Sequence, residues 1–171
     1  MSTVIAGMER AMDPNQDGNY SDHVDVISMS LGGPGTPDDA MSKAVDAATD
    51  AGIVVAAAAG NDGPGFATVA SPGLARKAIT VGATCKYVGQ SSYCQDRLLA
   101  SFSSKGTEDL SLKPEISAPG VYIYSTVPAS GQLGSPTRYR TMSGTSMATP
   151  HVAGAVALLL VVAVANVTNL F

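Results

Sequence analysis

The segment from Ile53 to Ala58 is a continuous run of apolar residues, followed by Ala59 and Gly60. A short apolar run without alternation is typical of a strand that is buried on both faces of a parallel sheet. Segments with helical character lie before and after it, which is the pattern of βαβ units. The sequence therefore predicts an α/β fold in which helices flank a parallel sheet. We expect helices at residues 3–12, 36–51 and 146–164, and further strands at residues 24–30, 78–83, 99–103 and 121–126.

The helix expected at residues 36–51 carries its own start and stop signals. Thr36 is suited to the N-cap position and Pro37 to the first helical position, with Asp38 and Asp39 in the first turn. Gly52 is suited to end the helix. The sequence thus predicts that this helix begins directly after the break at residues 32–35.

Length and charge limit the classes of protein that need to be considered. The 171 residues suit one domain, residues 1–171, with a sizeable core. The net charge is −4, so we expect no electrostatic nucleic-acid partner.

Residues 1–12 lack the form of a signal peptide. The apolar run at residues 152–165 is shorter than the ~18 residues of a membrane span. We therefore expect a buried core helix there and no membrane partner, with a membrane-facing tail as the alternative.

The two cysteines, Cys85 and Cys94, flank a polar segment. If they are bridged, the closed loop contributes about 2–3 kcal/mol to stability and indicates an oxidising compartment. The alternative is two free thiols. Two cysteines without CxxC spacing are a poor zinc signal.

A serine lies at the predicted start of the last helix, in the segment from Gly144 to Gly154. Unpaired N–H groups and the positive end of the helix dipole at such a position favour developing negative charge, so Ser146 is a candidate nucleophile. Gly144 permits close backbone approach, Thr145 is suited to cap the helix, and Pro150 should distort its early part. The pattern G-x-S-x-A differs at its last position from the nucleophile elbow of α/β-hydrolases.

Two further segments have open functional interpretations. Asn61 follows the buried strand at residues 53–58 and is either a donor to an oxyanion or an ordinary turn residue. The segment from Ser30 to Gly33 ends another strand in glycines. It is either an edge with which an extended peptide pairs or simply a strand terminus.

Taken together, these segments resemble the motif blocks of subtilisin-like serine proteases (subtilases), in the same order along the chain. The resemblance covers residues 24–160 and is carried by residues 28–33, 57–61, 113–120 and 144–148. It implies a partial three-layer subtilisin-like fold, a peptide or protein substrate, an extracellular location and no organic cofactor.

The resemblance also implies roles for individual residues. Ser146 matches the acylating nucleophile, and Asn61 matches the side-chain donor that forms an oxyanion hole with the backbone N–H of Ser146. The matching substrate-cleft residues are Ser30, Leu31 and Gly32 in one wall and Ala58, Ala59 and Gly60 in the other.

The general base that would activate Ser146 is missing from this pattern. His151 corresponds to a helix residue of the family, and His23 lacks the surroundings of the family's base. The family's Asp and His blocks would precede Met1, so the chain is expected to be the C-terminal portion of a catalytic domain. A serine without a base is a poor nucleophile, which predicts an inactive isolated chain. The alternative is a non-catalytic remnant that binds peptide or calcium.

Loss of the preceding strands would leave an open sheet edge. We therefore expect association with the missing N-terminal part of the domain or self-association.

Residues 13–19 alternate oxygen-bearing side chains in the manner of a calcium loop. The expected ligands are Asp13, Asn15 and Asp17, with Asp22 or Asp25 as a further carboxylate. Position twelve of an EF-hand loop needs Glu but is occupied here by Val24, so the loop is not an EF-hand. The alternative is a solvated turn.

Overall fold

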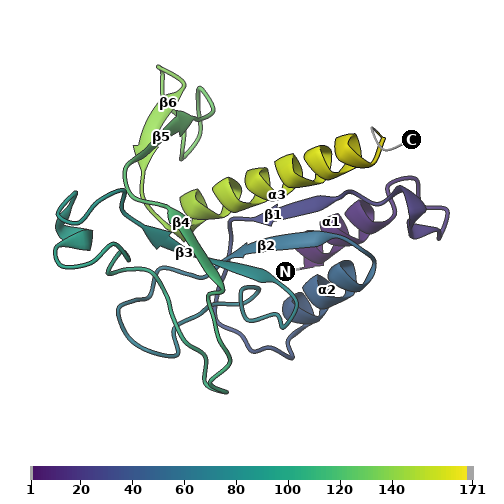
Figure 1. Cartoon of the computed structure of the whole chain (residues 1–171), viewed down its shortest axis with the longest axis horizontal. Coiled ribbons are helices and arrows are strands. Elements are labelled where there is room, and N and C mark those ends of the chain that lie inside the picture. Colours follow the sequence, from purple (N-terminus) through teal and green to yellow (C-terminus); the bar gives the residue numbers. More distant parts are fainter. Residues whose placement is uncertain (1, 169–171) are drawn as a thin grey trace.

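A four-stranded parallel sheet with the order β1-β2-β3-β4 forms the centre of the fold in a computed structural model, which describes residues 2–168 (Figure 1). The strands are β1 (Val26–Met29), β2 (Val54–Ala58), β3 (Ile79–Thr84) and β4 (Ile116–Pro119). In the register of this sheet, Val26 pairs with Val54 and Val81 pairs with Ile116. The predicted buried strand is the inner strand β2, which explains its unbroken apolar sequence.

Helices cover both faces of this sheet. Helices α1 (Ser2–Met12) and α2 (Ala40–Asp50) lie on one face, and α3 (Thr145–Thr168) lies across the other (Figure 1). Successive side chains of β2 point to opposite faces of the sheet, so the core is divided into two clusters. Val55 and Ala57 pack in the same cluster as Met8 of α1. Ala56 packs in the cluster that contains Val152 of α3. The predicted α/β architecture is thereby confirmed.

Helix α2 begins later than the sequence pattern predicted. The N-cap is Asp39 and not Thr36, and the helix runs from Ala40 to Asp50. The reason lies in the Asp39 carboxylate, which accepts the N–H of Ser42 at 2.8 Å and also the N–H of Thr36 at 2.9 Å. Asp39 therefore caps the helix and holds the preceding residues in a turn.

Two predicted strands do not become strands of the main sheet. Residues 99–103 contribute only an isolated bridge between Leu99 and Thr84, because the chain turns away from the sheet there. The predicted strand at 121–126 exists as β5 (Ile123–Thr126), but it pairs antiparallel with β6 (Tyr139–Met142) in a separate hairpin. The fourth strand of the main sheet is β4 instead. Stacking of Tyr124 on Tyr139, with ring centroids 5.4 Å apart, stabilises the hairpin.

The cysteines are joined by a disulfide. Cys85 follows β3, Cys94 ends the short 3₁₀ helix η2 (Ser92–Cys94), and their Cα atoms are 6.3 Å apart. Both residues are buried. Of the two alternatives that the sequence left open, the structure contains the bridge.

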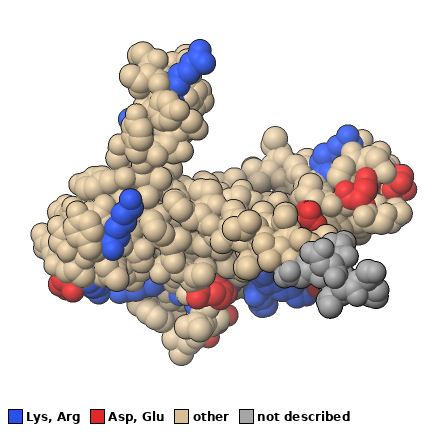
Figure 2. Space-filling view, turned by 45° about the horizontal axis from the view of Figure 1, so that its top comes forward, with Lys and Arg blue, Asp and Glu red and all other residues tan. Residues whose placement is uncertain are grey.

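Helix α3 is buried only near its beginning. Ala148, Val152 and Ala153 lie in the core, whereas the helix from Gly154 to Ala165 is largely exposed. The prediction of a core helix is therefore wrong for this second part, because the described chain contains no layer to cover it. In length and composition, α3 is the one helix among the described residues that is apolar enough to cross a membrane. Figure 2 shows a face with wide uncharged areas and charged side chains mainly toward its margins.

Candidate active site

Ser146 lies in the first turn of α3, directly against the carboxyl end of β1. Its Oγ–H donates to the backbone oxygen of Ser30 at 3.1 Å. In return, the Oγ–H of Ser30 donates to the backbone oxygen of Ser146 at 2.8 Å. The sequence placed these two serines in the nucleophile segment and in a cleft wall, and the structure brings them together.

Asn61 follows β2 and supplies the cap of α3. Its Oδ1 accepts the backbone N–H of Thr145 at 2.9 Å and the hydroxyl of Thr145 at 3.2 Å. The hydroxyl of Thr145 in turn accepts the N–H of Gly60 at 3.2 Å. Thr145 is fully buried and is the first residue of the helix, so it positions Asn61 and does not act as the expected N-cap.

Two hydrogen-bond donors remain available beside Ser146. The Oδ1 of Asn61 is occupied by Thr145, which leaves the Nδ2 group as the outward donor of this exposed side chain. Within residues 2–168, neither this Nδ2 nor the backbone N–H of Ser146 has a hydrogen-bond acceptor. A Cβ at Gly144 would make only ordinary van der Waals contacts with the Asn61 side chain, so it is the φ of +155° that favours glycine at this position. An oxyanion hole needs donors of this kind, and the role of the Asn61 Nδ2 and the Ser146 N–H in one stays a prediction.

The block around Gly120 fixes the backbone that precedes Ser146. The N–H of Gly144 donates to the carbonyl oxygen of Gly120 at 2.8 Å. A Cβ at Gly120 would lie 2.6 Å from the Cβ of Ala83 and 2.8 Å from the oxygen of Gly144. Only glycine therefore permits the close approach between the end of β4 and the start of α3.

The two expected cleft walls are joined by a segment that the sequence did not reveal. Ser71 exchanges both backbone hydrogen bonds with Gly33, beyond the wall formed by Ser30, Leu31 and Gly32. The other wall consists of Ala58, Ala59 and Gly60. Ala70 donates its N–H to the backbone oxygen of Ala59 in this wall. The Cβ of Ala70 also lies close to the positions that a Cβ would take at Gly32 and Gly60. The segment at 65–73 could be suspected from its small residues, but only the fold shows which of them joins the walls.

Neither histidine is hydrogen-bonded to Ser146. The Nδ1 of His151 pairs with the backbone oxygen of Met147, one turn earlier in α3, at 2.8 Å. The Nδ1 of His23 pairs with the oxygen of Val24 at 2.9 Å, and its ring lies against Gly52. Among the described residues, the only partner of the Ser146 Oγ is therefore a backbone carbonyl.

A groove of about 450 Å³ opens at Ser146, between the start of α3 and the β5–β6 hairpin. It is lined by residues that include Ser146, Met147, Pro150 and His151 of α3 and Tyr124 and Arg140 of the hairpin. The nucleophile candidate thus faces space large enough for another side chain or a peptide.

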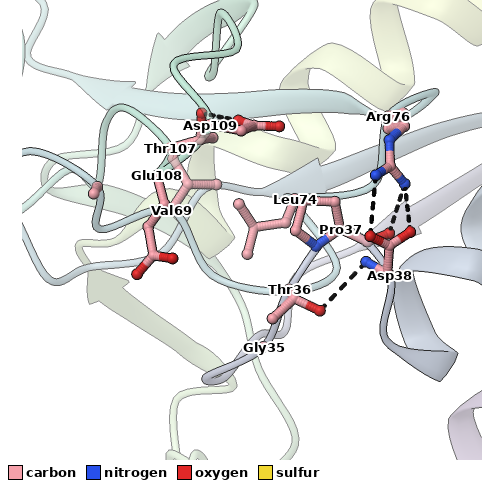
Figure 3. Close-up of a pocket in the computed structure, with 11 residues that line it drawn as sticks. Gly35, Thr36, Pro37, Asp38, Val69, Leu74, Arg76, Thr107, Glu108 and Asp109 are labelled. Atoms are coloured by element: carbon pink, nitrogen blue, oxygen red, sulfur yellow. Dashed lines mark hydrogen bonds and ion pairs between the residues drawn. The ribbon is translucent and has the colours of Figure 1, made fainter.

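A second pocket, of about 280 Å³, contains none of the predicted site residues (Figure 3). Arg76 forms hydrogen bonds of 3.0 and 3.2 Å to the carboxylate of Asp38. This hydrogen-bonded guanidinium lowers the pKa of Asp38. Hydrogen bonds from Thr107 and Ser111 lower the pKa of Asp109 to about 2. These contacts account for three of the charged residues that line the pocket, Arg76, Asp38 and Asp109.

Three of the predicted calcium ligands, Asp13, Asn15 and Asp17, lie in one loop that is organised by its own hydrogen bonds. The carboxylate of Asp13 accepts the N–H of Asp17 at 3.1 Å and that of Gly18 at 2.9 Å. Asn15 donates to the Asp17 carboxylate at 3.1 Å. Asp22 lies beyond the loop, in the 3₁₀ helix η1 (Tyr20–Asp22). In residues 2–168, no group of three or more His, Cys, Asp or Glu side chains is arranged to hold a metal ion. Calcium binding stays a prediction.

The fold and the site share two features with serine hydrolases, namely an α/β sheet and a serine at a helix N-terminus beside an amide side chain. More narrowly, the chain belongs to the subtilase family, whose family model matches residues 1–169. This confirms the resemblance predicted from the motif blocks.

Named relatives agree with this assignment. Serine protease AprX of Bacillus subtilis (strain 168) is 44% identical over 175 residues, which cover 94% of this chain and 38% of AprX. Subtilisin of Bacillus pumilus is 43% identical, with coverage of 93% and 48%. The solved structure of the S41 Psychrophilic Protease superimposes with a TM-score of 0.65 at 34% identity and covers 90% of this chain and 46% of that one. The chain therefore spans less than half the length of these proteins.

Proposed function

We propose that this chain is the nucleophile-bearing part of a serine endopeptidase, with Ser146 as the nucleophile and Asn61 as the side-chain oxyanion donor. The observation that carries the proposal is the bond between the Asn61 Oδ1 and the Thr145 N–H at 2.9 Å. This bond leaves the Asn61 Nδ2 as a fixed donor beside the first turn of α3. Family membership supports the same reaction class.

The chemistry follows from these positions. The Ser146 Oγ attacks the carbonyl carbon of a peptide bond, and the carbonyl oxygen becomes an oxyanion between the Ser146 N–H and the Asn61 Nδ2. A base must take the Oγ proton and return it to the leaving amine as the C–N bond breaks. Water then hydrolyses the acyl-enzyme and restores the hydroxyl.

We also propose that the chain alone is inactive, because no described side chain serves as this base. The Ser146 Oγ donates to the Ser30 carbonyl, which cannot accept the proton itself. Hydrolysis of a peptide p-nitroanilide by the purified chain tests this directly, with Ser146→Ala as the control. We expect equal background rates for both proteins. Turnover that a serine-protease inhibitor stops and Ser146→Ala abolishes would overturn the proposal.

The substrate proposed is an extended peptide or protein strand lying between the two cleft walls. The glycines of these walls support backbone pairing, because a main chain can approach them closely. An extracellular location is proposed on the family resemblance, and the Cys85–Cys94 disulfide supports an oxidising compartment. Calcium at Asp13, Asn15, Asp17 and Asp22 is a further proposal, supported by the spacing of the oxygen ligands along the sequence.

A further inference from the structure

Charged side chains are unevenly distributed along this chain. All 14 acidic residues lie at or before Glu115, and the net charge of the chain is −4. The residues that follow contain the β5–β6 hairpin and α3, and their two Lys or Arg side chains are Arg138 and Arg140. In Figure 2 the hairpin projects from the body of the molecule and shows basic but no acidic side chains. The hairpin is therefore locally positive on a protein that is negative as a whole.

Strand pairing places Arg140 on the face of the hairpin that lines the groove at Ser146. In the antiparallel register, Ser125 of β5 pairs with Arg140 of β6. Side chains two residues apart on a strand point to the same face, so Arg140 and Met142 lie side by side. Both line the groove of about 450 Å³ between the hairpin and the first turns of α3. Arg140 therefore belongs to the same concave surface as the candidate nucleophile.

No carboxylate of the groove neutralises Arg140. The lining residues include no Asp or Glu, and His151 is the one other side chain among them that can become positive. Within residues 2–168, Arg140 takes part in no ion pair. Its Nη1 donates to the backbone oxygen of Gln132 at 3.5 Å, which is longer than the usual hydrogen bond. The exposed guanidinium can therefore bind a carboxylate through two parallel hydrogen bonds.

Ser146 is the point at which the cleft walls and the groove meet. Its Oγ is hydrogen-bonded to the carbonyl of Ser30 in the first wall, and Ser146 also lines the groove. None of the six wall residues lines the groove. An extended peptide with a carbonyl carbon at Ser146 therefore runs from the walls on one side into the groove on the other.

We propose that this groove holds the part of the peptide substrate that continues past Ser146 from the cleft walls, and that Arg140 selects an Asp or Glu side chain in that part. The proposal rests on the proposed function, because Ser146 fixes where the substrate crosses. Charge complementarity supports an acidic segment, since the groove offers a guanidinium and no carboxylate. A substrate lysine or arginine in the same place would meet a like charge and is disfavoured. Because the guanidinium is exposed to solvent, the preference depends on salt.

Peptide binding to the full chain tests the proposal. Two fluorescein-labelled octapeptides have central alanines and two test residues at each end, glutamate in one peptide and glutamine in the other. Either direction of the peptide thus brings test residues into the groove. Fluorescence anisotropy measures both dissociation constants at low salt. We expect the acidic peptide to bind about tenfold more tightly, because its hydrogen bonds to Arg140 are charge-assisted. The difference should shrink at about 1 M salt.

Variants of the hairpin assign the preference to Arg140. Arg140→Gln should remove it, whereas Arg138→Gln, an equal change of charge on the same hairpin but outside the groove, should keep it. Ser125→Glu places a carboxylate opposite Arg140 and should remove the preference although the guanidinium is still present. Ser130→Glu adds the same charge outside the groove and should leave the preference in place. Circular dichroism confirms that each variant is folded.

Three results would overturn the inference. These are no binding of the acidic peptide up to millimolar concentration, equal affinity for both peptides, or a loss of preference in Arg138→Gln or Ser130→Glu as large as in Arg140→Gln. No bond is broken in this assay, so Ser146→Ala should show the wild-type preference. A missing preference refutes the role of Arg140 and leaves the proposed role of Ser146 untouched. A preference in a chain whose Ser146 proves unreactive refutes the catalytic role and leaves the acidic-peptide groove intact.

Discussion

Ser30 and Ser146 hold each other through two reciprocal hydrogen bonds, although they are 116 residues apart. Each hydroxyl donates to the backbone carbonyl of the other residue, at 2.8 Å from Ser30 and 3.1 Å from Ser146. The pair joins the end of β1 to the start of α3. It also gives the hydroxyl proton of Ser146, the candidate nucleophile, an acceptor, where no described side chain is hydrogen-bonded to it as a base.

Replacement of Ser30 should loosen this junction. Ser30→Ala removes the donor to the Ser146 carbonyl, and we expect the free energy of unfolding to fall by about 1 kcal/mol. Urea denaturation measures the change, with Ser130→Ala on an exposed loop as the matched control. Equal stability of the two variants would show that the bond donated by the Ser30 hydroxyl contributes nothing.

Variants of Asn61 should separate the roles of its two side-chain atoms. Asn61→Ala removes the acceptor for the Thr145 N–H and should destabilise the chain by about 1–2 kcal/mol, as loss of a helix cap does. Asn61→Asp keeps an acceptor oxygen and should remain closer to wild type. Thermal melting compares the three proteins. If Asp destabilises as much as Ala, the cap assignment is wrong.

Asp109 should make stability depend on pH in the acid range. Its pKa falls from 3.8 to about 2 through hydrogen bonds from Thr107 and Ser111. The unfolded chain therefore binds a proton at a higher pH than the folded chain does. The stabilisation from this group is complete above about pH 4 and is lost as the pH falls through about 2. NMR titration of the carboxyl carbon measures the pKa, and Thr107→Val should raise it. A pKa near 3.8 in the wild type would contradict the assignment.

Reduction of the disulfide should destabilise the chain. The Cys85–Cys94 bridge closes a short loop, for which the chain-entropy estimate is about 2–3 kcal/mol. Denaturation with and without a thiol reductant measures the loss, and Cys85→Ser/Cys94→Ser should match the reduced protein. Identical denaturation midpoints in both conditions would refute the prediction.

Calcium should raise the melting temperature if the loop at residues 13–19 binds it. Carboxylate ligands favour Ca²⁺, and a ligand that binds only the folded state stabilises it. Scanning calorimetry with calcium, with magnesium and with a chelator measures the shift, which Asp17→Ala should abolish. An unchanged melting temperature would mean that the loop is an Asx-rich turn.

The sequence pattern correctly predicted the inner strand β2, the alternation of strands and helices, and a helix that begins at about Ser146. These features depend on local properties, namely continuous apolar runs and helix-start residues, which the chain carries wherever it folds. The start of α2 was predicted three residues too early because Thr36 and Asp39 are both residue types that favour the N-cap position. Only the position of the Asp39 carboxylate, between two backbone N–H groups, shows which one is used.

The sequence by itself determined the α/β class and the subtilase family, and it singled out Ser146 and Asn61 as candidate site residues. The tertiary structure decided how these residues work together, since the cap of α3 comes from Asn61, 84 residues before Thr145. It also decided that α3 is largely exposed from Gly154 to Ala165 and that β5 pairs outside the main sheet. Burial and pairing are relations between distant segments, and local composition carries no record of which segment will be the neighbour.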